Sequence, residues 1–433
     1  MSEKEKLNIF WFRRDLRLED NHGLLHALKA DEKTIPIFIF DSNILDKIED
    51  KSDKRVSFIY DNLSKLHEQL QELGSSLLVK YGKPVDIWKE LIQDFDISCV
   101  YTNKDYEPYA LERDRKIEQL LHKNQIEFRP YLDQCIFDVH DILKNDGKPY
   151  TVYTPYKRKW LERLGPKNLL SYNNKKFFSG FYQHKLNILK LEDIGFSYSN
   201  HGLKRKIPLK IIENYDQTRD YPYINGTSLL GAHLRFGTVS IRKCAQVAYN
   251  KNETWLSELI WREFFMQILY HFPHVQTQPF KEKYSKIKWK NNKKDFEKWK
   301  NGQTGFPLVD AGMRELNQTG HMHNRVRMLV ASFLVKDLLI DWRWGEKYFA
   351  SKLLDFDLSA NNGNWQWAAG TGCDAAPYFR IFSPSNQIKK FDPDYKYIKK
   401  WVPEYGSEDY PEEMIDHNMA YHRAIKTYKE ALS

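Results

Sequence analysis

The sequence has few cysteines and no long apolar run. Its four cysteines, Cys99, Cys135, Cys244 and Cys373, are far apart and form no C-x-x-C pair. A disulfide framework or a zinc site is therefore not expected, and the chain fits a reducing compartment, the cytoplasm. No run of about 18 apolar residues occurs, so no membrane span is predicted. The N-terminal segment MSEKEKLNIFWF has only a short apolar run and is interpreted as a first strand, not a signal peptide.

The chain also lacks a large net charge of either sign. Among 433 residues, 67 Lys and Arg exceed 58 Asp and Glu by 9. This mildly basic balance permits a polyanionic partner but does not require one. Aromatic residues make up 15% of the chain, with 12 Trp and 26 Tyr, and such rings suit flat ligands or stacked bases as well as a core. At about 150 residues per domain, the length predicts two or three domains.

The first part of the sequence alternates apolar runs with amphipathic stretches. The runs LNIFWF, TIPIFIF, SSLLVKYG and ISCVYTN predict buried strands. The stretches between and after them predict helices over Asn21–Lys29, Lys54–Leu73, Val85–Phe95 and Tyr106–Asn124. This alternation predicts an α/β domain with a doubly wound parallel sheet over residues 1–134. No G-x-G-x-x-G follows the first strand, where WFRRDLRLEDN stands instead, so no dinucleotide site is expected there.

The pattern changes after residue 134. Residues 135–210 are rich in Asn, Lys, Ser and Gly, and only YTPYKRKWLERL predicts a helix, so we interpret them as an interdomain connector. Residues 211–433 predict an all-α domain punctuated by turns such as NGQTG. No internal repeat is visible.

One stretch of the helical part, His321–Phe382, combines unusual residues. HMHNRVRM predicts a helical start with Asn324, Arg327 and Met328 on one face. An apolar helix follows, and then a polar loop is expected over Asp355–Asn364. Trp365 and Trp367 come next, two residues apart, so in an extended chain they would point to opposite sides. A helical core with buried tryptophans explains the apolar helix, but not the amides and aspartates beside it.

Several motifs together resemble the photolyase/cryptochrome family, and within it the class I cyclobutane pyrimidine dimer photolyases. They are WFRRDLRLEDN near the start and GTSLLGAHL, SELIWREFF, MHNRVRM and ANNGNWQWAAGTG in the helical half. The resemblance covers nearly the whole chain. It implies an α/β antenna domain followed by an all-α FAD-binding domain. The implied activity is light-driven repair, in which photoexcited reduced FAD passes an electron to a pyrimidine dimer in DNA.

The resemblance implies a set of FAD-binding residues. Hydroxyls of Tyr215, Thr227 and Ser228 are expected near the phosphates. Arg327 is expected to pair with Asp355 beside the flavin ring, and Asn361 is expected to face flavin N5. The rest of the implied set is Leu229, Leu230, Trp255, Glu258, Arg262, Phe356 and Asp357. Leu229 and Gly231 replace the arginine and serine of the family's TSRLS motif, which removes one expected flavin contact.

The substrate side is implied in the same way. Glu258 is expected to hydrogen-bond the dimer, Trp261 and Trp367 to form its walls, and Asn324 and Met328 to complete the pocket. From the residues alone, a surface salt bridge to Arg262 at i+4 is an alternative for Glu258. The residues expected at the DNA are Arg219, Trp261, Asn324, Arg325 and Arg380.

Further expectations concern electrons, metals and pigments. Trp365, Trp342 and Trp289 match the chain of tryptophans that carries electrons to oxidised flavin. His321 and His323 form an H-x-H pair without suitably spaced partners, so no metal is expected. A second antenna chromophore, a folate or a deazaflavin, is left open. Folate-binding members have Asn-Glu where this chain has Tyr109 and Ala110.

Rival functions remain at this point. A cryptochrome-type blue-light photoreceptor shares the fold and the flavin, but the plant-type ones have aspartate where this chain has Asn361. Repair of the (6-4) photoproduct needs histidine chemistry where Asn324 and Met328 stand. A basic nucleic-acid-binding scaffold without catalysis would carry no flavin. We expect a monomer whose partner is UV-damaged DNA.

Overall fold

The computed structural model describes residues 5–433, and the first four residues of the N-terminal segment lie outside it. The described residues form two compact units, each assembled from separate pieces of the chain. The first unit comprises residues up to Ile142, Arg163–Ile207 and Leu230–Val247. The second comprises Leu143–Glu162, Pro208–Leu229 and Ala248–Ser433. The linear division at residues 134 and 210 stays a prediction.

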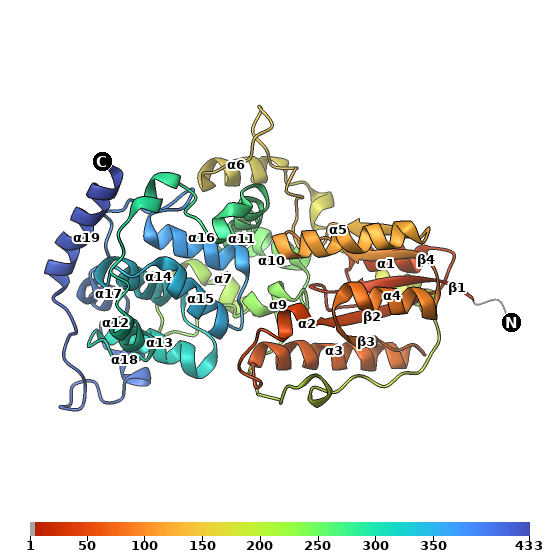
Figure 1. Ribbon diagram of the computed structural model, residues 1–433, viewed down its shortest axis with the longest axis horizontal. Helices are drawn as coiled ribbons and strands as arrows, with labels where there is room; N and C mark the ends of the chain where they lie inside the picture. The colour runs from red at the N-terminus through yellow and green to blue at the C-terminus, as the bar shows by residue number, and fades with distance from the viewer. Residues whose placement is uncertain (1–4) are drawn as a thin grey trace. The chain divides into compact units, whose positions relative to one another are not determined.

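The first unit contains a parallel five-stranded sheet with the order β3-β2-β1-β4-β5. Strands β1 to β4 are labelled in Figure 1. The strands are β1 (Lys6–Phe12), β2 (Thr34–Asp41), β3 (Leu78–Gly82), β4 (Asp96–Asn103) and β5 (Glu127–Tyr131). The predicted doubly wound parallel sheet is confirmed. The sequence did not reveal β5, because EFRPY is largely exposed and contains a proline, as an edge strand allows.

Helices cover both faces of this sheet. Phe10 and Phe12 of β1 pack in one core cluster with residues of α1 and α3, whereas Ile9 and Trp11 pack in another with residues of α4 and α5. This alternation follows from the two-residue repeat of a strand. The predicted helices are present, and Asn21, expected as a first helical residue, caps α1 instead. The helices of this unit are α1 (His22–Lys29), α2 (Ser42–Leu45), α3 (Lys54–Glu72), α4 (Pro84–Asp94), α5 (Pro108–Lys123), α9 (Gly231–Arg235) and the first part of α10 (Ile241–Lys251).

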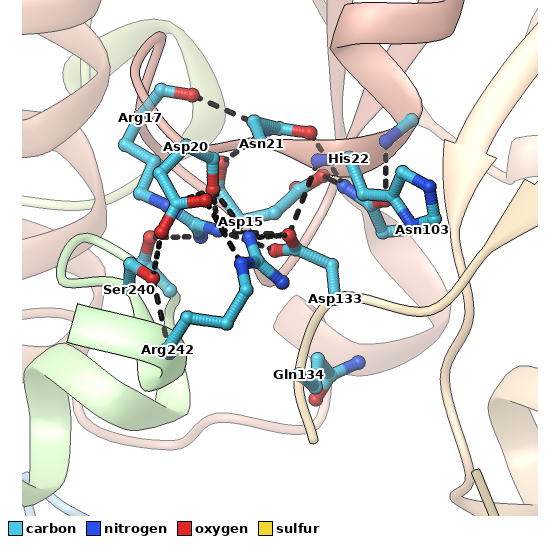
Figure 2. A network of polar contacts seen from close by, with 12 residues as sticks. Asp15, Arg17, Asp20, Asn21, His22, Asn103, Asp133, Gln134, Ser240 and Arg242 are labelled. Carbon is cyan, nitrogen blue, oxygen red and sulfur yellow. Dashed lines mark hydrogen bonds and ion pairs between the residues drawn. The ribbon is translucent and has the colours of Figure 1, made fainter. Parts of the chain in front are cut away.

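The WFRRDLRLEDN segment forms a buried polar network at the carboxyl end of β1 (Figure 2). Arg17 and Arg242 both donate to the carboxylate of Asp133, at 2.7 Å each, and Arg242 also pairs with Asp20 at 2.8 Å. Asp15 accepts from Asn103, the last residue of β4, at 2.6 Å. Ligands of such sheets bind where the strand order reverses, here between β1 and β4. In this protein, the side chains of the polar network lie at that position.

The second unit is built almost entirely from helices, as predicted. Trp299, Phe349 and Trp365 belong to its main core cluster. Its α-helices are α6 (Tyr153–Arg163, up to Glu162), α7 (Leu209–Glu213), α8 (Tyr215–Thr218), α11 (Glu253–His271), α12 (Lys293–Lys300), α13 (Pro307–Thr319), α14 (Asn324–Ser332), α15 (Trp342–Lys352), α16 (Leu358–Ala369), α17 (Pro384–Phe391), α18 (Lys396–Trp401) and α19 (His417–Leu432). A π-helical turn, η6 (Phe333–Asp337), continues α14.

The prediction of a polar loop over Asp355–Asn364 is wrong, because most of this segment is helical. Helix α16 begins at Leu358, because Asp357 caps it by accepting from the backbone N–H groups of Ser359 and Ala360. Buried partners then hold the polar residues in helical conformation, as when the Asn362 amide donates to Val275 O at 2.8 Å. Trp365 and Trp367 are therefore helical and about 200° apart around the axis. Trp365 is 2% exposed and Trp367 is half-buried.

Candidate functional site

The second unit has a cavity between α14, α15, α16 and the segment before α16. Nine of the site residues expected from the sequence lie on its wall: Asn324, Arg327, Met328, Asp355, Phe356, Asp357, Asn361, Trp365 and Trp367. The other wall residues are Ala331, Phe349, Leu353, Ala360, Asn364 and Ala368.

An arginine–carboxylate pair lies on this wall. Arg327 Nη2 donates to both oxygens of Asp355, at 2.9 and 3.2 Å, and Arg327 Nε donates to Met322 O at 2.6 Å. Burial acts to raise the pKa of Asp355, but the Arg327 guanidinium holds it below its usual value. The site therefore has a fixed guanidinium beside an ionised carboxylate.

Asn361 is held by a residue that the sequence did not single out. Its amide Nδ2 donates to Glu346 Oε1 at 2.8 Å and to Glu346 O at 3.1 Å. This leaves the Asn361 carbonyl oxygen as the acceptor available to a ligand. Burial raises the pKa of Glu346, and the hydrogen bond from Asn361 opposes that rise. Glu346 lies on α15, 15 residues before Asn361, and no sequence spacing points to this contact.

Asn324, Met328 and Trp367 give the cavity a mixed polar and apolar edge. Asn324 Nδ2 lies 4.0 Å from Met328 Sδ, one helical turn away on α14. Trp367 stacks loosely on Phe382, with ring centroids 6.4 Å apart. The helical spacing of α14 predicted that Asn324 and Met328 share a face, and Trp367 of α16 lines the same cavity.

Two residues of α11, Glu258 and Trp261, have partners that the sequence did not predict. Glu258 pairs with Arg219 at 2.5 Å, whereas the sequence offered a salt bridge to Arg262 as the alternative. Burial raises the pKa of Glu258, and Arg219 opposes this. Trp261 stacks on Tyr153, with ring centroids 3.6 Å apart and planes 8° apart. Tyr153 comes from the expected connector but belongs to the helical unit.

The arginines expected at DNA phosphates differ in their surroundings. Arg325 pairs with Asp220, and its guanidinium lies 4.4 Å from the ring centroid of Phe391. Arg219 lies between Glu258 and Asp220, so it is held by carboxylates on two sides. Arg380 is exposed in the segment after α16.

The residues expected near the phosphates lie on and after α8. Tyr215 begins α8, and Thr227, Ser228 and Leu229 follow in the irregular segment before α9. Leu229 is exposed and has a φ of 53°, a left-handed conformation that is strained for leucine. Two expected residues lie elsewhere: Leu230 is a buried cap of α9, in the other unit, and Trp255 is buried in α11. Arg262 is half-buried.

Among the described residues, the three tryptophans of the expected electron path are not in ring contact with one another. Trp365 contacts Phe349 at 5.0 Å and Trp299 at 6.2 Å between ring centroids. Trp289 contacts Tyr428 at 6.1 Å. Trp342 is buried at the start of α15, and no ring contact among the described residues links it to Trp365 or Trp289. The path stays a prediction.

The remaining candidates have local roles. His323 caps α14 by accepting from the Arg325 N–H at 3.2 Å. Across residues 5–433, no three His, Cys, Asp or Glu side chains gather as a metal site. Tyr109 donates to Asp41 at 2.6 Å and accepts from Asn43, and Ala110 is buried, so this position offers no carboxylate to a folate. None of the described helices is long and apolar enough to cross a membrane.

Comparisons with known proteins agree over both units. Residues 8–171 match the family model of DNA photolyase, and residues 255–407 match that of the FAD binding domain of DNA photolyase. The deoxyribodipyrimidine photo-lyase of Synechococcus is 35% identical over 95% of this chain and 94% of its own. The class III photolyase of Agrobacterium tumefaciens has a TM-score of 0.87 and 31% identity, covering 100% of this chain and 98% of its own. The archaeal photolyase of Sulfolobus tokodaii, solved with two FAD molecules, has a TM-score of 0.81 and 34% identity, covering 98% and 99%.

Proposed function

Because the chain belongs to the photolyase/cryptochrome family, we propose that it is a deoxyribodipyrimidine photolyase, a lyase that splits cyclobutane pyrimidine dimers in DNA by blue light. The observation that carries this proposal is the cavity on α14 and α16. It brings the Arg327–Asp355 pair, the Asn361 carbonyl and the Asn324–Met328–Trp367 edge to one space. A cryptochrome-type photoreceptor is the alternative.

The residues present fit FAD. The Arg327 guanidinium would stabilise negative charge on a reduced flavin ring, and Asp355 keeps that guanidinium in place. The Asn361 carbonyl would accept a hydrogen bond from a ring N–H, because its amide nitrogen is engaged by Glu346. Reduced FAD, when bound, supplies the electron that light transfers to the dimer and that returns after ring opening. A second, antenna chromophore would be bound by the first unit. Tyr109 stands where folate-binding members have asparagine, which argues against a folate there.

The substrate side would bind the extruded dimer. Glu258 and Asn324 would hydrogen-bond its carbonyl and imide groups, while Trp261, Met328 and Trp367 would pack on its rings. Arg219, Arg325 and Arg380 would contact phosphates, so affinity should fall with salt and carry little sequence preference. We further propose that the chain acts as a monomer in the cytoplasm. All four cysteines are free thiols, which a reducing compartment favours.

Light-dependent repair of a defined lesion tests the proposal. A short DNA with one thymine dimer is mixed with protein whose flavin has been chemically reduced, and half of each sample is kept dark. We expect loss of the dimer only in the illuminated half. Flavin-loaded protein that leaves the dimer intact under light would favour the photoreceptor alternative.

A further inference from the structure

Lys336 is a buried lysine that the proposed repair reaction does not use. It lies in the π-helical turn η6 and is 1% exposed. Its ammonium donates to Ala369 O at 3.1 Å and to Tyr378 O at 3.2 Å, and it lies 3.7 Å from the ring centroid of Tyr428. No carboxylate among the described residues pairs with it. Burying a charged lysine against only carbonyl groups and a ring face costs free energy, and a role for Lys336 would explain why the protein keeps it there.

The partners of Lys336 come from three segments, of which α16 also lines the cavity. Ala369 is the last residue of α16, whose final carbonyls have no partner within the helix. A cation at this end of a helix also interacts favourably with the helix dipole. Tyr378 belongs to the segment 371–383, which carries Arg380. Tyr428 of α19 stacks on Tyr378 with planes 7° apart, and its hydroxyl donates to the same Ala369 O at 2.8 Å.

The π-helical turn explains how the lysine reaches these groups. Helix α14 begins at the cavity with Asn324 and Met328, and η6 continues it directly. A π-helical turn re-aims the side chains within a continuous helix and is frequent near functional sites. The continuous helix formed by α14 and η6 therefore lines the cavity at its N-terminal end. At its C-terminal end, Lys336 binds the last residue of α16. Burial lowers the pKa of Lys336 to about 7.

We propose that Lys336 is a positioning residue for the substrate side, fixing the end of α16 to the segment 371–383. Trp367 lies two residues before Ala369 and stacks on Phe382 of that segment. Lys336 therefore holds together the two pieces of chain that carry Trp367 and Arg380. Lys336 is not among the wall residues of the cavity. We call the contacts of Lys336 with Ala369 and Tyr378 the clamp. The effect of the clamp on DNA binding rests on the proposed function, whereas the clamp itself does not.

The test compares Lys336→Met, which keeps the stem but removes the donors, with Lys336→Arg and with Tyr428→Phe as a matched control. The control removes another donor to Ala369 O and keeps the ring under the ammonium. The full FAD-loaded chain is measured on a duplex with one thymine dimer. For Lys336→Met we expect the Kd to rise about tenfold or more, with repair per bound dimer within about twofold of the parent. Lys336→Arg should recover part of the affinity, and Tyr428→Phe should stay near the parent.

Hydrogen exchange separates this role from general destabilisation. In Lys336→Met, amides of residues 371–383 and the last turn of α16 should exchange faster, while those of the first unit should not. Unchanged exchange there, an unchanged Kd, or parallel loss of FAD and DNA binding would overturn the inference. If Lys336→Met does not fold, Lys336→Gln replaces it under the same criteria. A parent protein without light-dependent repair would refute the proposed function, and the exchange data would still decide on the clamp.

Discussion

Asn361 donates from one amide nitrogen to two oxygens of the same residue, Glu346 Oε1 at 2.8 Å and Glu346 O at 3.1 Å. This fixes which end of the Asn361 amide faces the cavity. A carbonyl oxygen in that place accepts hydrogen bonds and cannot donate them. Glu346 thus sets the chemical character of the group expected opposite flavin N5.

Glu346→Ala removes the Oε1 acceptor and leaves only the backbone oxygen of residue 346 to hold the Asn361 amide. The amide should therefore be held less firmly, and its preference for a protonated, reduced flavin should weaken. We expect FAD to stay bound and its midpoint potential to become more negative by on the order of 30 mV, a tenfold change for a two-electron couple. Glu346→Gln keeps an oxygen acceptor and should stay closer to the parent. Redox titration followed by visible absorption measures both. Equal potentials in all three proteins would mean that Glu346 does not control Asn361.

Asp15 should make the stability of the protein depend on pH. Burial, opposed by the hydrogen bond from the Arg13 N–H, raises its pKa from 3.8 to about 6. The folded protein therefore keeps this proton where the unfolded chain has lost it, and stability falls as the pH rises from about 4 through about 6. The loss from this group is on the order of 3 kcal/mol.

Asp15→Asn removes that titration. Relative to the parent, its free energy of unfolding should improve between about pH 4 and about pH 7, by up to about 3 kcal/mol. The altered hydrogen bond to Asn103 adds an offset that is the same at every pH. Urea unfolding at several pH values measures the difference, with exposed Asp31→Asn as the control. Parallel curves for Asp15→Asn and the parent would show that Asp15 does not retain its proton.

Two aromatic routes lead away from Trp365, and substitution separates them. The expected route ends at Trp289, whereas direct ring contacts run through Trp299 and Phe296 to Trp344. Trp289→Phe should slow photoreduction of oxidised flavin, leave repair by chemically reduced protein intact, and have more effect than Trp344→Phe. Absorption under constant blue light measures the rate. A larger effect of Trp344→Phe would assign the electron path to the contacting rings.

Glu258→Ala should weaken repair by removing a charge-assisted hydrogen bond, worth about 1.5–3 kcal/mol. Its ion pair with Arg219 means that the same change releases a cation toward DNA phosphates. Affinity for undamaged DNA should therefore hold or rise while repair falls. Binding and repair are measured on the same duplex with and without the dimer. A parallel loss of both would mean that Glu258 acts only by holding Arg219.

The fold followed from the sequence where patterns were local. Alternating apolar runs predicted four of the strands, but exposed β5, with Pro130, lacked that pattern. Asn and Asp indicated a loop before Trp365, whereas a single capping residue, Asp357, and buried amide partners made the segment helical. Local propensity could not reveal these tertiary partners.

The candidate site followed mainly from the resemblance. It predicted that Arg327 pairs with Asp355, and the pair is present on the cavity wall. It did not predict the contacts of Glu346 with Asn361, of Tyr153 with Trp261, or of Lys336 with Ala369. Each joins segments that no helical spacing relates, so only the folded chain brings them together.

The most direct test of the account compares two lesions in otherwise identical short DNA, a thymine dimer and a (6-4) photoproduct, under blue light with reduced flavin. The cavity edge holds an amide and a thioether at Asn324 and Met328 and no histidine among its wall residues. A cyclobutane dimer needs no proton transfer to a leaving hydroxyl, so it should be repaired, while the (6-4) lesion stays. Repair of the (6-4) lesion alone, or of neither lesion, would contradict the account.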